Sequence, residues 1–192
     1  MVVMKMEGNI RENIYPALIL TVIVLASASS LTATNHVTKD RIQEIREENI
    51  SNMIEDHFPG MDDYGYKDDL GTYVIYEQGS VMGYAFEASI EGYGGPIELL
   101  IALDGPLASK EDVNIRGISI IEHEETPGLG AKITSDSFKN QFNEVSLDDM
   151  YLSEKGGEID SISGATISST SVVKGVREST KSKLSKFIEA NK

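Results

Sequence analysis

The feature that most constrains this chain is a run without any charged residue, which extends from Ile14 to Ala33. A helix of about 20 residues spans the ~30 Å hydrocarbon core of a bilayer, and this run has that length. A helix of a soluble protein usually keeps a polar face, which disfavours a purely buried core helix. Ala26-Ser27-Ala28 is similar to a signal-peptidase site, so a cleaved signal peptide is the alternative. Because the run continues beyond Ala28, we favour an uncleaved transmembrane anchor.

The residues around this run divide the chain into four predicted parts. Residues 1–13 are a short polar tail, 14–33 the transmembrane helix, 34–60 a linker helix, and 61–192 the folded domain. The linker is predicted as a helix because apolar residues recur at helical spacing between charged ones, and Pro59-Gly60 ends it. Lysine and arginine residues lie on both sides of the run, so the positive-inside rule does not orient it.

Composition excludes several kinds of chemistry. The chain has no cysteine, which excludes disulfides, iron–sulfur clusters, thiol catalysis and CxxCH haem attachment. Its three histidines are too scattered for a recognisable zinc site, and we expect no metal ligands and no catalytic residues in the strict sense. A net charge of −14 disfavours nucleic-acid binding, which needs a basic surface. A redox role would therefore need an organic cofactor.

The domain is predicted to have an α+β fold with a mostly antiparallel sheet and flanking helices. Four apolar runs with β character are predicted as strands: Tyr73–Tyr76, Met82–Ile90, Ile97–Leu103 and Val113–Glu122. Residues 61–72 and 143–158 are acidic and predicted as turns or loops. Phe138 and Phe142 lie four residues apart and indicate a short helix over 135–142. A last helix is predicted to begin near Ser168 and to run to the end of the chain.

Three glycine-containing segments interrupt these elements. They are Gly92-Tyr93-Gly94-Gly95-Pro96-Ile97, His123-Glu124-Glu125-Thr126-Pro127-Gly128-Leu129-Gly130-Ala131-Lys132, and Asp160 to Thr170. The local interpretations are a wide hairpin turn, a solvated loop and a helix N-terminus, respectively. The third segment has more hydroxyl side chains than a helix cap uses. The glycines would also let backbone approach a ligand closely.

Asp160-x-x-Ser163-Gly164-Ala165-Thr166 resembles the flavinylation motif of the FMN-binding domain family. This family includes the G subunit of Rnf-type electron-transport complexes and the C subunit of the Na⁺-pumping NADH:quinone reductase. The other two segments are similar to family signatures as well. The resemblance covers roughly residues 9–190, and the short chain is closer to the Rnf-type protein than to the longer reductase protein.

The resemblance implies that Thr166 carries FMN through a phosphodiester bond, which makes the protein formally a phosphoprotein. No histidine lies near Thr166 in the sequence, and an unaided threonine hydroxyl is a poor nucleophile. The family uses a separate Mg²⁺-dependent flavin transferase, which takes FMN from FAD. The expected cofactor-binding residues are Thr166, Asp160, Ser163, Gly164, Ala165, Tyr93, Gly94, Thr126, Gly128, Leu129 and Gly130.

The implied function is that of an electron-carrying subunit of an Rnf-type ion-translocating oxidoreductase. Its partners would be other membrane and peripheral subunits of such a complex, and the flavin transferase during maturation. This chain alone would not complete a catalytic cycle. The resemblance places it in the cell (inner) membrane, with the FMN domain on the extracytoplasmic side. The alternatives are a C-type subunit of the quinone reductase, a free-standing membrane-anchored flavoprotein, and a non-redox ligand-binding or sensor domain.

Overall fold

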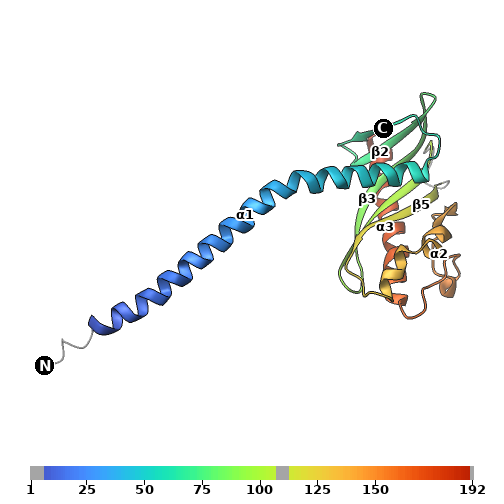
Figure 1. Cartoon of the computed structure of the whole chain (residues 1–192). Coiled ribbons are helices and arrows are strands. Elements are labelled where there is room, and N and C mark those ends of the chain that lie inside the picture. Colours follow the sequence, from blue (N-terminus) through green and yellow to red (C-terminus); the bar gives the residue numbers. More distant parts are fainter. Residues whose placement is uncertain (1–6, 107–112, 191–192) are drawn as a thin grey trace. The chain divides into compact units, whose positions relative to one another are not determined.

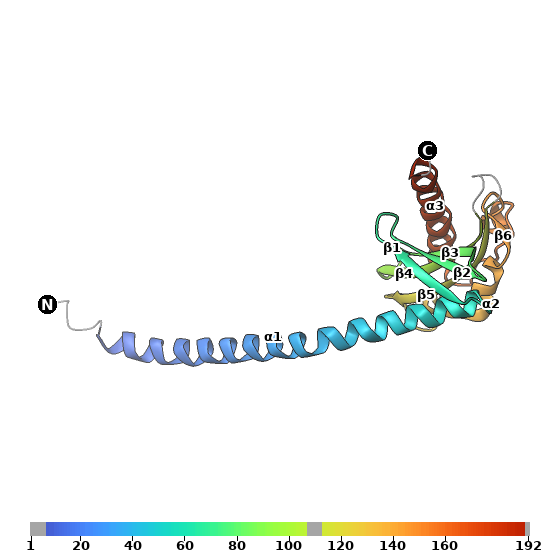
Figure 2. The same cartoon turned by 90° about the horizontal axis from the view of Figure 1, so that it is seen from above.

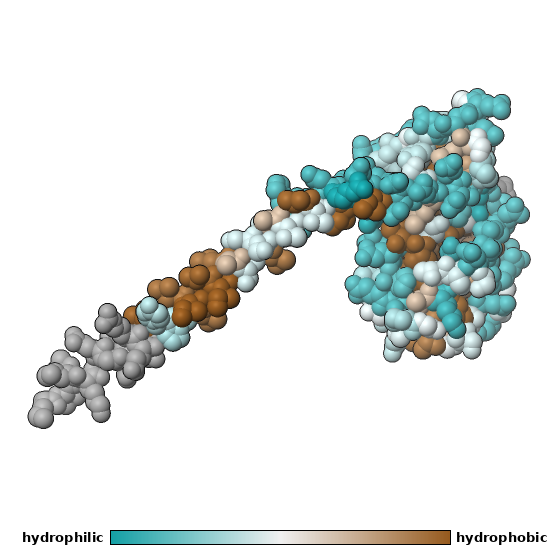
Figure 3. Space-filling model, in the orientation of Figure 1, coloured by the Kyte–Doolittle hydropathy of each residue, from teal (hydrophilic) through white to brown (hydrophobic). Residues whose placement is uncertain are grey.

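The computed structural model describes residues 7–106 and 113–190, which form two compact units that divide between Glu48 and Asn49. The first unit is the greater part of helix α1 (Glu7–His57). From Ile14 onward this helix is long and apolar enough to cross a membrane, and its side chains are exposed from Ile14 to Ile45. Figure 3 shows the apolar side chains gathered along this stretch of α1. These properties are consistent with a single-pass membrane anchor.

The second unit is built on a six-stranded antiparallel sheet whose spatial order is the order of the sequence, β1 to β6. The strands are β1 (Asp63–Lys67), β2 (Thr72–Glu77), β3 (Ser80–Glu91), β4 (Pro96–Asp104), β5 (Asn114–His123) and β6 (Val145–Ser146). The four strands predicted from apolar runs are all confirmed as β2 to β5. The helices of this unit are the last turns of α1, α2 (Asp136–Lys139) and α3 (Thr166–Ala190) (Figure 1). The predicted α+β class is therefore confirmed.

The prediction of turns over residues 61–72 is wrong at β1. This edge strand pairs with β2 through all five of its residues, from Asp63 opposite Tyr76 to Lys67 opposite Thr72. Most of its side chains are exposed, so it lacks the apolar alternation that identifies a half-buried strand. Tyr66 instead packs its ring against Tyr73 of β2, at 4.8 Å between ring centroids. Cross-strand aromatic pairs of this kind stabilise a strand that buries little else.

Both faces of the sheet are apolar. Helix α3 covers one face and the last turns of α1 cover the other (Figure 2). The side chains of β4 divide between the faces, with Leu99 and Ile101 in one core and Leu100 and Ala102 in the other. The first core includes buried residues of α3. The second core includes Ile50, Ile54 and Phe58, which belong to the end of α1 and the residue after it. A strand buried on both faces has no polar alternate positions, which explains the continuous apolar run from Leu99 to Leu103.

The end of α1 is fixed to the sheet by His57. Its imidazole Nε2 lies 2.9 Å from Ser119 Oγ on β5, and its backbone oxygen accepts a hydrogen bond from Arg116 Nε. A Cβ atom at Gly117 would lie 2.6 Å from the imidazole Cε1, so a glycine is needed beneath the ring. Burial lowers the pKa of His57 below its ordinary value of 6.5; Lys139 and Arg116 act in the same direction, and Asp56 opposes them.

This pKa shift predicts an acid-dependent loss of stability. The unfolded chain takes up a proton on this imidazole near pH 6.5, whereas the folded chain does so only at lower pH. His57 therefore reduces stability as the pH falls from 6.5 toward its folded pKa, by at most about 1.4 kcal/mol per pH unit. Urea unfolding of the detergent-solubilised chain should show less acid sensitivity in His57→Gln than in the wild type. Equal acid sensitivity of the two proteins would show that His57 does not cause the acid-dependent loss of stability.

Candidate functional site

The three glycine-containing segments meet at one pocket of about 450 Å³. The pocket is lined by Tyr93, Glu125, Thr126, Leu129, Gly130, Gly164, Ala165, Thr166, Ile167 and Ser168. The volume lies within the ~300–1,000 Å³ that is typical of small-molecule sites. The sheet brings the first two segments together, since the first connects β3 to β4 and the second follows β5. The third segment leads into α3, which packs against β3 and β4.

Glu125 lies where the three segments meet. Its Oε1 accepts hydrogen bonds from the backbone amides of Tyr93 at 2.6 Å and Gly94 at 3.3 Å. Its Oε2 accepts a hydrogen bond from the hydroxyl of Ser168 at 2.6 Å, a contact between residues 43 positions apart. The side chain is only 4% exposed. A single buried carboxylate therefore connects all three segments.

Two glycines make room for this carboxylate. A Cβ atom at Gly92 would lie 2.2 Å from Glu125 Oε1, and one at Gly130 would lie 2.3 Å from Oε2. Distances below about 3 Å between such atoms are not tolerated without movement. The need for glycine at Gly92 and Gly130 thus comes from the carboxylate between them.

The interpretation of the His123–Lys132 segment as a solvated loop is wrong at Glu125. Sequence reasoning missed this residue, because a glutamate beside other glutamates has the ordinary pattern of a solvated surface. His123 is half-buried at the end of β5, and its Nδ1 accepts the amide hydrogen of Glu125 at 3.2 Å. Within residues 7–106 and 113–190, no three His, Cys, Asp or Glu side chains are grouped to hold a metal ion.

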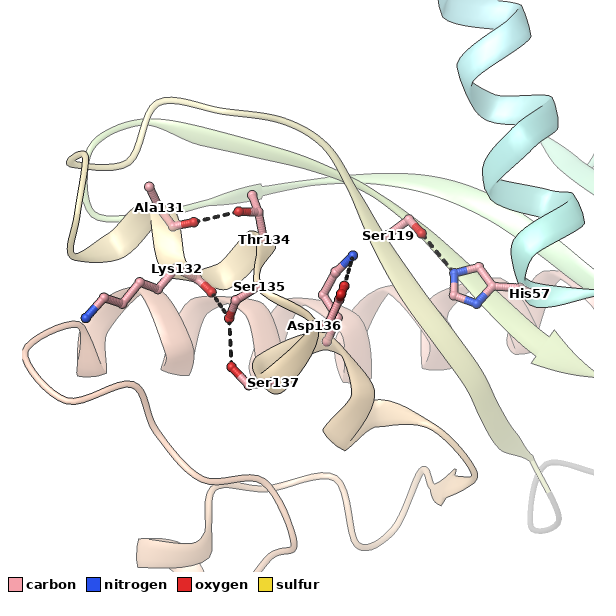
Figure 4. Close-up of polar contacts among 9 residues, drawn as sticks. His57, Ser119, Ala131, Lys132, Thr134, Ser135, Asp136 and Ser137 are labelled. Carbon is pink, nitrogen blue, oxygen red and sulfur yellow. Dashed lines mark hydrogen bonds and ion pairs between the residues drawn. The ribbon is translucent and has the colours of Figure 1, made fainter.

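The turn after Thr126 is closed by short-range hydrogen bonds. The amides of Leu129 and Ala131 both donate to the carbonyl oxygen of Thr126, at 3.2 and 3.1 Å. Further along, the Thr134 hydroxyl donates to the carbonyl oxygen of Ala131, and the Ser135 hydroxyl donates to that of Lys132 (Figure 4). Leu129 and Gly130 of the second segment therefore line the pocket from a turn that is held by several hydrogen bonds.

Thr166 is the first residue of α3, two residues before the predicted start. Gly164 precedes it with φ +80°, a left-handed conformation that favours glycine. The Ser169 hydroxyl closes this turn, since it donates to Ala165 O and accepts from the Ile162 amide, both at 3.0 Å. Thr166 itself is exposed. The first amides of a helix have no partner within the helix, so they are available to an anion at the pocket.

The structure brings together seven of the eleven residues expected to bind a cofactor: Tyr93, Thr126, Leu129, Gly130, Gly164, Ala165 and Thr166. Gly94 does not line the pocket, and its amide donates to Glu125. Asp160, Ser163 and Gly128 are exposed and do not line it. Asp160 instead donates its amide to Gln141 Oε1 at 2.7 Å. The binding roles of these residues stay predictions.

An exposed apolar rim surrounds the pocket, which the sequence prediction captured only in part. It consists of Tyr93, Leu129 and Ile167, which are 67%, 47% and 57% exposed. Large apolar side chains exposed together mark a ligand-binding or interaction site. Ile167 was not among the expected binding residues.

A second, more polar pocket of about 460 Å³ lies near the end of α1 and is lined by residues that include His57, Arg116 and Ser119. Figure 4 shows His57 directed at Ser119. Arg116 donates to Asp104 Oδ1 at 3.0 Å in addition to the His57 carbonyl oxygen, and Lys139 pairs with Asp136 at 3.1 Å. The two cations that line it, Arg116 and Lys139, are therefore engaged in contacts within the fold.

Comparison with known proteins places the chain, and with it the first pocket, in a protein family. The FMN-binding domain family matches residues 92–181, a range that contains all three segments. The G subunit of an ion-translocating oxidoreductase complex from Methanosarcina acetivorans is 31% identical over 174 residues, covering 84% of this chain and 90% of that protein. The G subunit of the complex of the same name from Stutzerimonas stutzeri is 32% identical over 186 residues, covering 86% and 79%.

A crystal structure of the C subunit of the Na⁺-translocating NADH-quinone reductase from Parabacteroides distasonis is also similar, with 27% identity and a TM-score of 0.47 over 60% of this chain and 61% of that one. The pocket, the family match and the two G-subunit relatives together define an electron-transport flavoprotein with an FMN-binding domain. The chain belongs to the FMN-binding domain family, which includes the G subunits of ion-translocating oxidoreductase complexes. The resemblance seen in the sequence is confirmed.

Proposed function

We propose that this chain is the electron-carrying subunit of a membrane-bound, Rnf-type ion-translocating oxidoreductase, and that FMN is joined to its Thr166 by a phosphodiester bond. The observation that carries the proposal is the position of Thr166. It is exposed at the N-terminus of α3 and at the edge of the pocket, with the other two family segments on the pocket's remaining walls. The names of the relatives support the kind of complex.

The residues of the pocket fit FMN in three respects. The cavity has the volume of a small-molecule site, and the rim offers apolar side chains against which a planar ring packs. The amides at the start of α3 are available where a phosphate on Thr166 would lie, and the positive end of the helix dipole favours that charge. The left-handed Gly164 allows the chain to turn into the helix there.

Attachment requires a second protein. Within the described part of the chain, no side chain is hydrogen-bonded to the Thr166 hydroxyl as a base, and the hydroxyl alone is a poor nucleophile. A flavin transferase would supply the base and Mg²⁺. The threonine oxygen would bond to the FMN phosphorus of FAD, the pyrophosphate bond would break, and AMP would leave with the hydroxyl proton delivered to the base. Exposed Asp160 and Ser163 are suited to recognition by such an enzyme rather than to holding the flavin.

Once attached, FMN supplies reversible electron transfer, and the protein supplies position and electrostatic environment. The anchor would hold the domain at the membrane, beside the other membrane and peripheral subunits of the complex. On the extracytoplasmic side a lost flavin cannot be replaced from the cytoplasmic pool, so a covalent bond keeps the cofactor in place.

The proposal is tested by making the full chain with and without a flavin transferase. The chain made with the enzyme should fluoresce under ultraviolet light on a denaturing gel, and its mass should rise by one FMN less one water. The chain made without it should do neither. A chain that stays dark in both cases would favour the non-redox alternative. Purification of the tagged chain from membranes with a multi-subunit complex would distinguish a member of such a complex from a free-standing flavoprotein.

A further inference from the structure

Glu125 places a buried negative charge in the wall of the pocket. Its carboxylate is 4% exposed, and the three groups that donate to it are all neutral: two backbone amides and the Ser168 hydroxyl. Across the two described stretches of the chain, no lysine or arginine forms an ion pair with it. The charge is therefore held by hydrogen bonds and is not balanced by a neighbouring cation.

We propose that Glu125 is a positioning residue for the flavin site and that its charge lowers the reduction potential of the flavin held there. This inference rests on the proposed function. Reduction adds negative charge to the flavin ring system. A fixed carboxylate in the same pocket wall repels that charge and so favours the oxidised flavin. A buried group is poorly screened by salt, which makes the effect persist at high ionic strength.

The positioning role follows from the three hydrogen bonds. Oε1 fixes the backbone at Tyr93, whose ring belongs to the apolar rim. Oε2 fixes Ser168 in the first turn of α3, two residues after the proposed attachment site. Loss of the side chain would free both walls and remove the acceptor of the Tyr93 and Gly94 amides.

The two roles can be separated by substitution. In Glu125→Gln the side-chain carbonyl still accepts from the Tyr93 and Gly94 amides. Its amide group can donate to Ser168 Oγ, because a hydroxyl both donates and accepts. This variant removes the charge and keeps the contacts, whereas Glu125→Ala removes both. Glu125→Asp keeps the charge on a shorter side chain. Glu122→Gln, on an exposed position of β5, is the matched control for loss of a nearby surface charge.

The experiment is a spectroelectrochemical titration of the full, flavin-loaded chain in detergent. We expect Glu125→Gln to carry covalent flavin at the wild-type yield. Its flavin should be easier to reduce, by about tenfold in the one-electron equilibrium constant, which corresponds to about 59 mV. The same shift should remain in high salt. Glu122→Gln should change the equilibrium constant less than about twofold, and salt should abolish that change.

A Glu125→Gln flavin that titrates at the wild-type potential would overturn the charge effect. A shift of about tenfold in Glu125→Asp relative to the wild type would overturn it too, because that variant keeps the charge. This comparison needs only the wild type, so it also decides the matter if the glutamine variant is unstable. Thermal unfolding of the chain made without transferase tests positioning without any cofactor. Glu125→Ala should unfold at a clearly lower temperature than Glu125→Gln, and equal temperatures would overturn that role. A wild-type chain that takes no flavin counts against the proposed function instead.

Discussion

Replacing Thr166 with alanine abolishes covalent flavin in the chain produced with the transferase. The expected loss is complete, because alanine offers no oxygen for the phosphoester bond. Thr166→Ser keeps a hydroxyl at the same place, primary instead of secondary, and should retain part of the label. In-gel fluorescence and intact-protein mass measure the result directly.

The matched control is Thr170→Ala. Thr170 lies one helical turn further along α3, and its hydroxyl donates to the carbonyl oxygen of Thr166. The substitution removes a neighbouring hydroxyl without touching the proposed attachment atom, so fluorescence should stay near the wild-type level. A fluorescent Thr166→Ala with a dark Thr170→Ala would move the attachment site to Thr170.

Replacing Gly130 with alanine should disrupt the site from within. The new Cβ would lie 2.3 Å from Glu125 Oε2 and 2.9 Å from Ser168 Oγ, so it forces apart the hydrogen bond between those groups. Overpacking of this kind typically costs about 1–3 kcal/mol of stability. We expect urea unfolding of the chain to shift by that amount, and flavin bound in the pocket to become more exposed to an added quencher.

Gly65→Ala is the control for this substitution. A Cβ atom at Gly65 would meet nothing within 4 Å, and the residue lies on the exposed strand β1. Its stability and flavin quenching should match the wild type, or stability should rise slightly, since alanine has less backbone freedom to lose than glycine. Equal effects of Gly130→Ala and Gly65→Ala would show that the Glu125–Ser168 contact is unimportant.

Secondary structure was predicted best from the sequence where the local pattern of apolar residues agrees with the burial of their side chains. The strand over Ile97–Leu103 was predictable because all its side chains except the half-buried Glu98 are apolar and buried. The helix after Thr166 was predictable because its apolar residues recur at helical spacing. The three segments of the site were predictable because they resemble signatures of the FMN-binding domain family. By local pattern only the third stands out, because it has more hydroxyl side chains than a helix cap uses. The exposed strand β1 gave no such signal.

Glu125 was beyond prediction for a different reason. Nothing in its neighbours distinguishes it from Glu122 or Glu124, which are exposed. Its burial depends on donors from residues 93, 94 and 168, which only the folded sheet and α3 bring to it. A buried polar group is identified by its partners, and partners distant in sequence are not visible in a local pattern.

The two-sided core of the sheet has a practical consequence for anyone who wants the domain without its membrane segment. Ile50, Ile54 and Phe58 precede the first strand, yet they fill the core beneath β2, β3 and β4. A soluble fragment cut at the start of the sheet, near residue 61, would leave that face bare to water and prone to self-association. A fragment that begins at Asn49 keeps these side chains, and we expect this fragment to stay monodisperse.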